Sequence, residues 1–231
     1  MISKTKLVFL LFTLSTFSFS QKSVMENEGK IIPFLTFKNI DIGELTKRGS
    51  AAINKDELEI VAGGSDIWGK HDEFHFSYKK LKGDFDMSVQ IISLGAAHLY
   101  TKSGIMARTN LSDSSQHVFF QVFPDNSPRN KNNGGCEFQY RTAHGAEMKA
   151  IYPDLKTSGN QFDVAFPNTW IRLKRQGDVF ESYFSNDDKT WRLYSSFTLN
   201  MPRKLLVGLA VTAHNSNDYT KSGFVAIRLK K

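Results

Sequence analysis

Apolar and polar side chains alternate along most of this chain with a period of two. The pattern is sharpest at 73–78, where Phe74, Phe76 and Tyr78 share one side of an extended chain and Glu73, His75 and Ser77 share the other. The aromatic side predicts a core-facing surface, and the polar side predicts either solvent or a site. Similar short stretches recur about 8–12 residues apart between glycine- and asparagine-rich turns, which predicts an all-β fold, a two-sheet antiparallel β-sandwich.

Several further stretches fit this prediction, and none shows the apolar period of a helix. Residues 117–123 are apolar on both faces, as in a central strand, and 170–175 with 179–184 form a hairpin around a Gln-Gly-Asp turn. Residues 31–37 predict a first strand, whereas 41–43 and 48–52 predict turns. The other expected strands are 58–62, 85–92, 103–109, 137–142, 191–194, 205–213 and 223–229.

The first twenty residues have the pattern of a secretory signal peptide. Lys4 and Lys6 precede the short apolar run 7–14, and small residues follow up to Ser20. We expect cleavage near Ser20–Gln21 and a secreted or periplasmic protein. No stretch approaches the roughly 20 apolar residues that a membrane-spanning helix needs. The predicted organisation is a signal peptide at 1–20, an extension with an edge-strand pattern at 21–38, and one sandwich domain at 39–231.

Charge and cysteine content narrow the set of partners. The formal net charge of +7 favours an anionic partner such as an acidic polysaccharide, while lysines and arginines are scattered, so we expect no nucleic-acid partner. Cys136 is the single cysteine and excludes an internal disulfide. It alternates with Phe138 at the start of a strand and is predicted to be a small buried hydrophobe.

Eight segments occur in the order found in the DUF1349 family, and the chain resembles that family over roughly 40–230. The segments are Gly49–Ala51, Gly64–Gly69, Asp72–Tyr78, Lys102–Arg108, Phe138–Thr142, Trp170–Leu173, Tyr183–Trp191 and Val207–Asn215. The resemblance implies a concanavalin A-like jelly roll, a fold whose concave face often binds sugar. Asp188 stands where the family usually has glycine, and we expect it to adopt the left-handed conformation.

Polar residues of the alternating strands supply the candidate carbohydrate site on that face. Carboxylate, imidazole, guanidinium and amide groups are the donors and acceptors that sugar hydroxyls need, and Trp68 could stack on a sugar ring. The candidate ligand-binding residues are Trp68, Glu73, His75, Arg108, Gln139, Arg141, His214 and Asn215.

Two alternatives stay open, a glycan-active enzyme and a structural or partner-binding module. Glu73 and His75 are the candidate catalytic residues, but Glu73 lacks the second carboxylate on its own strand face that a retaining glycosidase needs. A polysaccharide lyase would use residue types found at Gln116–His117, Gln139 and Arg141, although Tyr140 alternates toward the core. In a purely structural module the polar faces would only contact water.

Metal ions and cofactors find little support in the sequence. His71 and His75 would lie about 13 Å apart on one strand, too far to share an ion. The loop 215–218 offers oxygen ligands for Ca²⁺, but its sequence is more typical of a turn. We therefore expect no cofactor and no metal site. The hairpin 185–191 resembles an Asp-box, in which Asp187 and Trp191 stabilise the fold.

Overall fold

The structure is a computed structural model that describes residues 30–31, 33–124, 135–152 and 169–231. The signal peptide expected at 1–20, with its cleavage point, lies outside these residues. A single 3-10 turn (η1, Phe34–Thr36) accompanies the strands in this part of the chain. The strands are β1 (Lys30–Ile31), β2 (Lys38–Ile42), β3 (Ser50–Asn54), β4 (Glu57–Ala62), β5 (Ile67–Trp68), β6 (His71–Asp72), β7 (Phe74–Lys82), β8 (Phe85–Leu94), β9 (Lys102–Arg108), β10 (His117–Val122), β11 (Cys136–Arg141), β12 (Lys149–Ile151), β13 (Thr169–Gln176), β14 (Val179–Ser185), β15 (Arg192–Thr198), β16 (Lys204–Thr212) and β17 (Thr220–Lys230).

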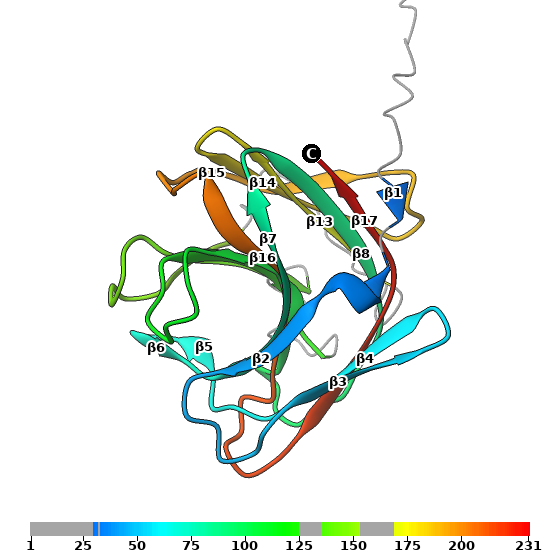
Figure 1. Cartoon of the computed structure of the whole chain (residues 1–231), viewed down its shortest axis with the longest axis vertical. Coiled ribbons are helices and arrows are strands. Elements are labelled where there is room, and N and C mark those ends of the chain that lie inside the picture. The colour runs from blue at the N-terminus through cyan, green and yellow to red at the C-terminus, as the bar shows by residue number, and fades with distance from the viewer. Residues whose placement is uncertain (1–29, 32, 125–134, 153–168) are drawn as a thin grey trace, which may run out of the picture.

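These strands form two large antiparallel sheets, which confirms the predicted jelly-roll sandwich. One sheet has eight strands in the order β15-β14-β13-β8-β17-β4-β3, with β1 paired to β17. The other has seven, in the order β12-β11-β10-β9-β16-β7-β2, and β5 with β6 makes a separate small ribbon. Figure 1 shows the β5–β6 ribbon on the side of β16 that is remote from β8 and β17.

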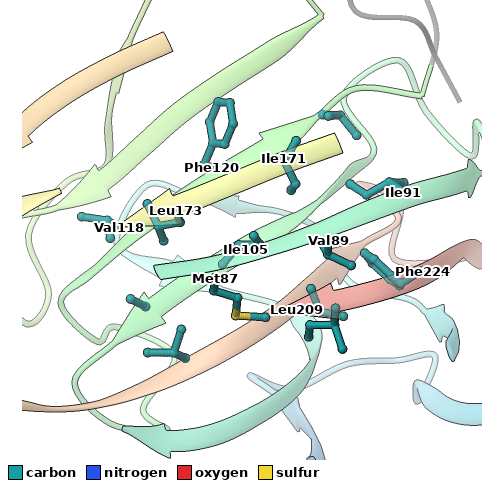
Figure 2. Packing of buried hydrophobic residues seen from close by; sticks show 14 of the residues in the cluster. Met87, Val89, Ile91, Ile105, Val118, Phe120, Ile171, Leu173, Leu209 and Phe224 are labelled. Carbon is teal, nitrogen blue, oxygen red and sulfur yellow. The ribbon is translucent and has the colours of Figure 1, made fainter. Parts of the chain in front are cut away.

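The main core fills the space between the two large sheets. Alternate residues of both sheets meet there, among them Ile105, Val118 and Phe120 from one and Val89 and Ile171 from the other (Figure 2). The predicted core position of Cys136 is confirmed, because its side chain is fully buried in this cluster. Burial of apolar area on this scale stabilises a sandwich that has no disulfide.

A second apolar cluster lies on the outer face of the seven-stranded sheet, the face turned away from the main core. Phe74, Phe76 and Tyr78 belong to it, together with Met106 and Phe119 and with Ile67 of the small ribbon. The aromatic side of β7 is therefore buried as predicted, but against the β5–β6 ribbon and not between the sheets. This layer makes the outer face partly an interior.

The predictions for three elements near the N-terminus were wrong. Residues 31–37 contain η1 where one strand was expected, and β2 and β3 occupy stretches that had been predicted as turns. β2 pairs with β7, and β3 pairs with β4, so pairing at two sheet edges outweighed the local turn signals. Asp188 adopts the expected left-handed conformation, with φ 61°. No helix within the described residues is long and apolar enough to cross a membrane.

Candidate functional site

Polar side chains gather on the outer face where β9, β10 and β11 lie side by side. The strand register aligns them in three rows across the sheet. The rows are Arg108–His117–Arg141, then Met106–Phe119–Gln139, then Gly104–Gln121–Glu137. We call these residues the polar rows; the polar members are each at most 2% exposed.

Asp72 on the ribbon reaches over the first row and forms a buried ion pair with Arg141. Its two carboxylate oxygens accept hydrogen bonds of 2.7 Å from Arg141 Nη1 and Nη2. Arg141 also donates to the carbonyls of Gly69 at 2.9 Å and Ala146 at 2.9 Å. Every nitrogen of this guanidinium is thus engaged by the protein. Burial raises the pKa of Asp72 despite the opposing effect of Arg141.

Arg108, in contrast, is a buried cation with free donors. One nitrogen donates to the carbonyl of Ser112, and the guanidinium lies 5.1 Å from the Phe74 ring centre and 3.8 Å from an oxygen of Asp72. Its Nε and Nη1 have no hydrogen-bond partner among the described residues. Burial lowers the pKa of Arg108 to about 10, so the side chain stays charged at neutral pH.

His117 sits between the two arginines as a neutral imidazole. Its Nδ1 donates to the carbonyl of Ser115 at 3.0 Å, which leaves Nε2 as an acceptor, and no described residue donates to it. Burial lowers the pKa of His117 well below 6.5, and the charges of Arg108 and Arg141 lower it further. This face therefore offers an acceptor beside a cationic donor.

The neutral state of His117 predicts a pH-dependent loss of stability. In the unfolded chain the imidazole takes up a proton as the pH falls below 6.5, while the folded protein resists it, so the free energy of unfolding falls by up to about 1.4 kcal/mol per pH unit. Urea unfolding between pH 7.5 and roughly 5 measures the slope. His117→Gln is expected to reduce the slope, because glutamine has no ionisable group. Equal slopes in wild type and His117→Gln would contradict the assignment.

Two glutamines extend the set of unpartnered groups along the face. Gln121 has neither donor nor acceptor engaged by the described residues, and the Gln139 oxygen is likewise without a partner. The Gln139 amide nitrogen donates to Glu137. An unmet buried polar group costs about 1–3 kcal/mol, so several on one face are unusual for a purely structural sheet.

Small and aromatic residues border the polar rows. Gly208 of β16 lies beside Met106 on one side and Tyr78 of β7 on the other. Tyr78 stacks on Phe76 with ring centres 5.1 Å apart. Gly104 is required by its surroundings, because an added Cβ would lie 2.1 Å from the backbone oxygen of Phe120. The outer face thus has polar side chains on β9, β10 and β11, glycines at Gly104 and Gly208, and aromatic side chains on β7.

Two of the predicted site residues, Trp68 and His214, lie in a second cluster at the far end of β9. Lys102 donates to Asp66 at 2.7 Å, and its ammonium lies 5.4 Å from the ring centre of Trp68, which is 42% exposed. His214 Nδ1 lies 3.1 Å from Asp66, and the His214 ring stacks on His98 at 4.5 Å. Burial opposes ionisation of Asp66, but its contacts with His214 and Lys102 outweigh that effect and lower its pKa.

The predicted site is thus only partly assembled. Arg108, Gln139 and Arg141 share the outer face, as expected. His75 does not: it pairs in register with Val211 of the main core, so it points to the inner face, where its Nδ1 bonds Asp41 at 2.8 Å. The prediction that His75 shares a face with the arginines is therefore wrong, because alternation gives the two faces of a strand without saying which faces which layer.

Glu73 and Asn215 belong to turns and not to the polar rows. A carboxylate oxygen of Glu73 accepts a hydrogen bond of 3.0 Å from the backbone of Ser65. The Asn215 backbone donates to the carbonyl of Gly64, and its side-chain oxygen accepts from Asn217. Both residues hold the loops around the glycine turn. Glu73 is therefore separated from the partners that a catalytic role on the outer face would require.

Three residues of the site were not among the predicted ligand-binding residues. Asp72 was left out, and Gln121 lies in a strand that was predicted to be apolar on both faces. His117 was considered only for a lyase. The sequence contained a signal for His117 and Gln121. They are four residues apart, with Phe119 midway between them, so all three share one face of an otherwise apolar strand.

Metal binding gains no support from the described part of the chain. No group of three or more histidine, cysteine, aspartate or glutamate side chains there could hold an ion. His71 and His75 each pair with a different carboxylate, Asp113 and Asp41. Asp187 of the Asp-box hairpin behaves as predicted, since it accepts backbone hydrogen bonds of 2.9 Å from Lys189 and 2.7 Å from Thr190. Trp191 is only partly buried.

Comparison with known proteins agrees with the fold. A family model described as "Protein of unknown function (DUF1349)" matches residues 49–230. No curated protein sequence matches the chain. Among solved structures, a functionally unknown protein from Saccharomyces cerevisiae is similar, with 14% identity, 86% of this chain and 98% of that chain covered, and a TM-score of 0.64.

Two further structures of similar fold carry carbohydrate terms in their names. The carbohydrate binding module CBM66 from Bacillus subtilis has 13% identity, with 84% of this chain and 95% of that chain covered and a TM-score of 0.51. The exoplasmic/lumenal domain of VIP36, in a Ca²⁺/Man-bound form, has 12% identity, with 84% and 82% covered and a TM-score of 0.50. At these identities the similarity establishes the fold alone.

Proposed function

Because the chain belongs to the DUF1349 family, which is described as one of unknown function, we propose a role from its own side chains: it binds carbohydrate on the outer face of the seven-stranded sheet. The observation that carries this proposal is the set of buried donors and acceptors on β9, β10 and β11 that have no partner in the described part of the chain. A sugar hydroxyl both donates and accepts, so it can satisfy such neighbours together.

The spacing of these groups suits an extended ligand. Arg108 and His117 occupy the first row, Gln139 the second and Gln121 the third, so polar contacts repeat every two residues, or about 7 Å, along the strands. The stacked rings of Phe76 and Tyr78 lie on the same face but are at most 6% exposed, so they form its packed apolar border. Trp68 is exposed beside Lys102 and supplies the stacking surface for a sugar ring, near the end of β9.

The fold and the N-terminal pattern agree with this role. Two structures of similar fold are named as a carbohydrate binding module and as a Ca²⁺/Man-bound lumenal domain. The leader pattern at 1–20 supports a secreted or periplasmic location, where a polysaccharide partner is available. Asp72 and Arg141 take a supporting part, because they fix the ribbon over the first row.

Removing either glutamine side chain tests the proposal. Gln121→Ala and Gln139→Ala are each expected to weaken binding roughly three- to tenfold, since each loses about one neutral hydrogen bond. Affinity electrophoresis against a polysaccharide panel, followed by calorimetry with the best ligand, measures the change. Gln90→Ala is the matched control. Gln90 lies in the eight-stranded sheet, where it pairs with Trp170, and it is flanked by the core residues Val89 and Ile91, so it is remote from the proposed site.

The possible results distinguish an error in the location of the site from an error in the function. Equal weakening in Gln121→Ala and Gln90→Ala would contradict a site on the outer face, and failure to bind any polysaccharide would contradict the function itself. A purely structural or partner-binding module predicts this second result. In that case water molecules would supply the missing hydrogen-bond partners of the polar rows.

A second candidate function is eliminative cleavage of an acidic polysaccharide, favoured by the neutral His117 beside the cationic Arg108. His117 Nε2 would take the proton on the carbon next to the carboxylate. The bond to the β-oxygen would break, a carbon–carbon double bond would form, and the departing oxygen would receive the proton. Ultraviolet absorbance of unsaturated products tests this, and activity that survives His117→Gln would exclude the role.

A further inference from the structure

We infer that the carbohydrate bound on the outer face is anionic, carrying a carboxylate or a sulfate ester, and that Arg108 holds that group. The inference rests on the proposed carbohydrate site and specifies its ligand. It starts from the balance of buried charge in the first of the polar rows. Two guanidiniums lie there, and both side chains are fully buried.

One carboxylate, that of Asp72, faces both guanidiniums. Its oxygens are committed to Arg141 by two hydrogen bonds of 2.7 Å, whereas the nearest approach to Arg108 is 3.8 Å. Asp72 thus neutralises Arg141 and leaves Arg108 with a weak electrostatic contact. Among the described residues, the row therefore carries one buried positive charge in excess.

The other acids near the row do not remove this excess. Asp113 raises the pKa of Arg108 slightly, but its side chain is 39% exposed and pairs with His71 at 2.9 Å. Glu137 lies four residues before Arg141 on β11, about 13 Å along the strand, and accepts a hydrogen bond from Gln139. His117 remains neutral and adds no charge of its own.

The surroundings of Arg108 hold its charge without using all of its donors. The Phe74 ring at 5.1 Å stabilises the cation, and the Ser112 carbonyl takes one nitrogen. Nε and Nη1 remain without a partner among the described residues. A buried charge is stable only when it is paired and hydrogen-bonded, and a planar guanidinium matches the oxygens of a carboxylate or sulfate. A neutral sugar would accept hydrogen bonds from Arg108 but would leave its positive charge without a counter-charge.

Polymers that share a backbone and differ only in charge provide the test. Polygalacturonate is compared with its methyl ester, and a sulfated galactan with the same galactan after desulfation, by calorimetry with the full chain. Binding to the acid form of one pair is expected to be about ten- to a hundredfold tighter than to its neutral form, which also identifies the anion as carboxylate or sulfate. The preference should decrease with added salt.

Arg108→Gln is expected to abolish the preference, so that within this variant the acid form and the neutral form of the polymer bind equally. Arg203→Gln removes the same charge from an exposed position and should keep the preference. If Arg108→Gln fails to fold, Arg108→Lys retains the cation without its planar fork and should keep a reduced preference. Equal binding of charged and neutral polymers overturns the inference and leaves the proposed function intact, whereas no binding to any polymer overturns the proposed function.

Discussion

Replacing Arg141 with alanine is expected to lower the free energy of unfolding by about 3–5 kcal/mol, because the change strands a buried carboxylate. Asp72 is fully buried and would lose both of its short hydrogen bonds. The carbonyls of Gly69 and Ala146 would each lose the hydrogen bond from the guanidinium as well. Urea unfolding followed by fluorescence measures the loss.

An exposed ion pair between the turn of this ribbon and the segment before β12 serves as the control. Lys70 and Glu147 approach to 3.8 Å with side chains 58% and 63% exposed, so Lys70→Ala is expected to change stability by less than about 1 kcal/mol. Adding Asp72→Ala to Arg141→Ala should recover part of the loss, since the buried carboxylate that lost its guanidinium partner is then removed as well. If the double variant is as unstable as the sum of the two single variants, the two residues do not act as a pair.

The two arginines of the first row therefore have different roles, although the sequence treated them alike. Both alternate with core residues on central strands, and both were predicted to bind ligand. What separates them is Asp72, which arrives from a ribbon far away in the sequence and engages Arg141. The strand patterns of β9 and β11 contain no information about that contact. Only the folded ribbon shows that Asp72 holds Arg141 and that two nitrogens of Arg108 have no partner among the described residues.

The sandwich itself was predictable because its strands follow local rules. Alternation at 85–92, 103–109 and 137–142 located β8, β9 and β11, and the Gln176-Gly177-Asp178 turn located the β13–β14 hairpin. Asp188 could be predicted as well, since a turn of this type requires a residue that tolerates positive φ. In each case the decisive interaction lies within a few residues of the chain.

The orientation of β7 could not be predicted in the same way. Its two faces alternate as clearly as any in the chain, but both are buried: the aromatic face under the β5–β6 ribbon, and the His75 face against Asp41 and the main core. Hydrophobicity normally identifies the core side of a strand, and here a second apolar layer outside the sheet reverses that inference. The error in placing His75 follows from this reversal.

Replacing Ile67 with alanine is expected to lower the free energy of unfolding by about 2–5 kcal/mol and to loosen the ribbon that covers the site. Ile67 is fully buried among Phe74, Phe76, Met106 and Phe119, so truncation leaves a cavity under the ribbon. β5 and β6 are two residues each and have little stability of their own. Urea unfolding and amide hydrogen exchange measure the two effects.

Exchange should accelerate most at amides that tie the ribbon and its flanks to neighbouring segments. The amide of Asp72 donates to Asp113 at 3.0 Å, and that of Met148 donates to Gly69 at 3.0 Å. Ile53→Ala is the control, because Ile53 is 40% exposed on the edge strand β3 and should lose less than about 1 kcal/mol. A stability loss in Ile67→Ala without faster exchange at Asp72 and Met148 would contradict the covering role, because the ribbon would then remain in place without its apolar anchor. Faster exchange together with weaker polysaccharide binding would connect the ribbon to the site, since the ribbon carries Asp72 over the first of the polar rows.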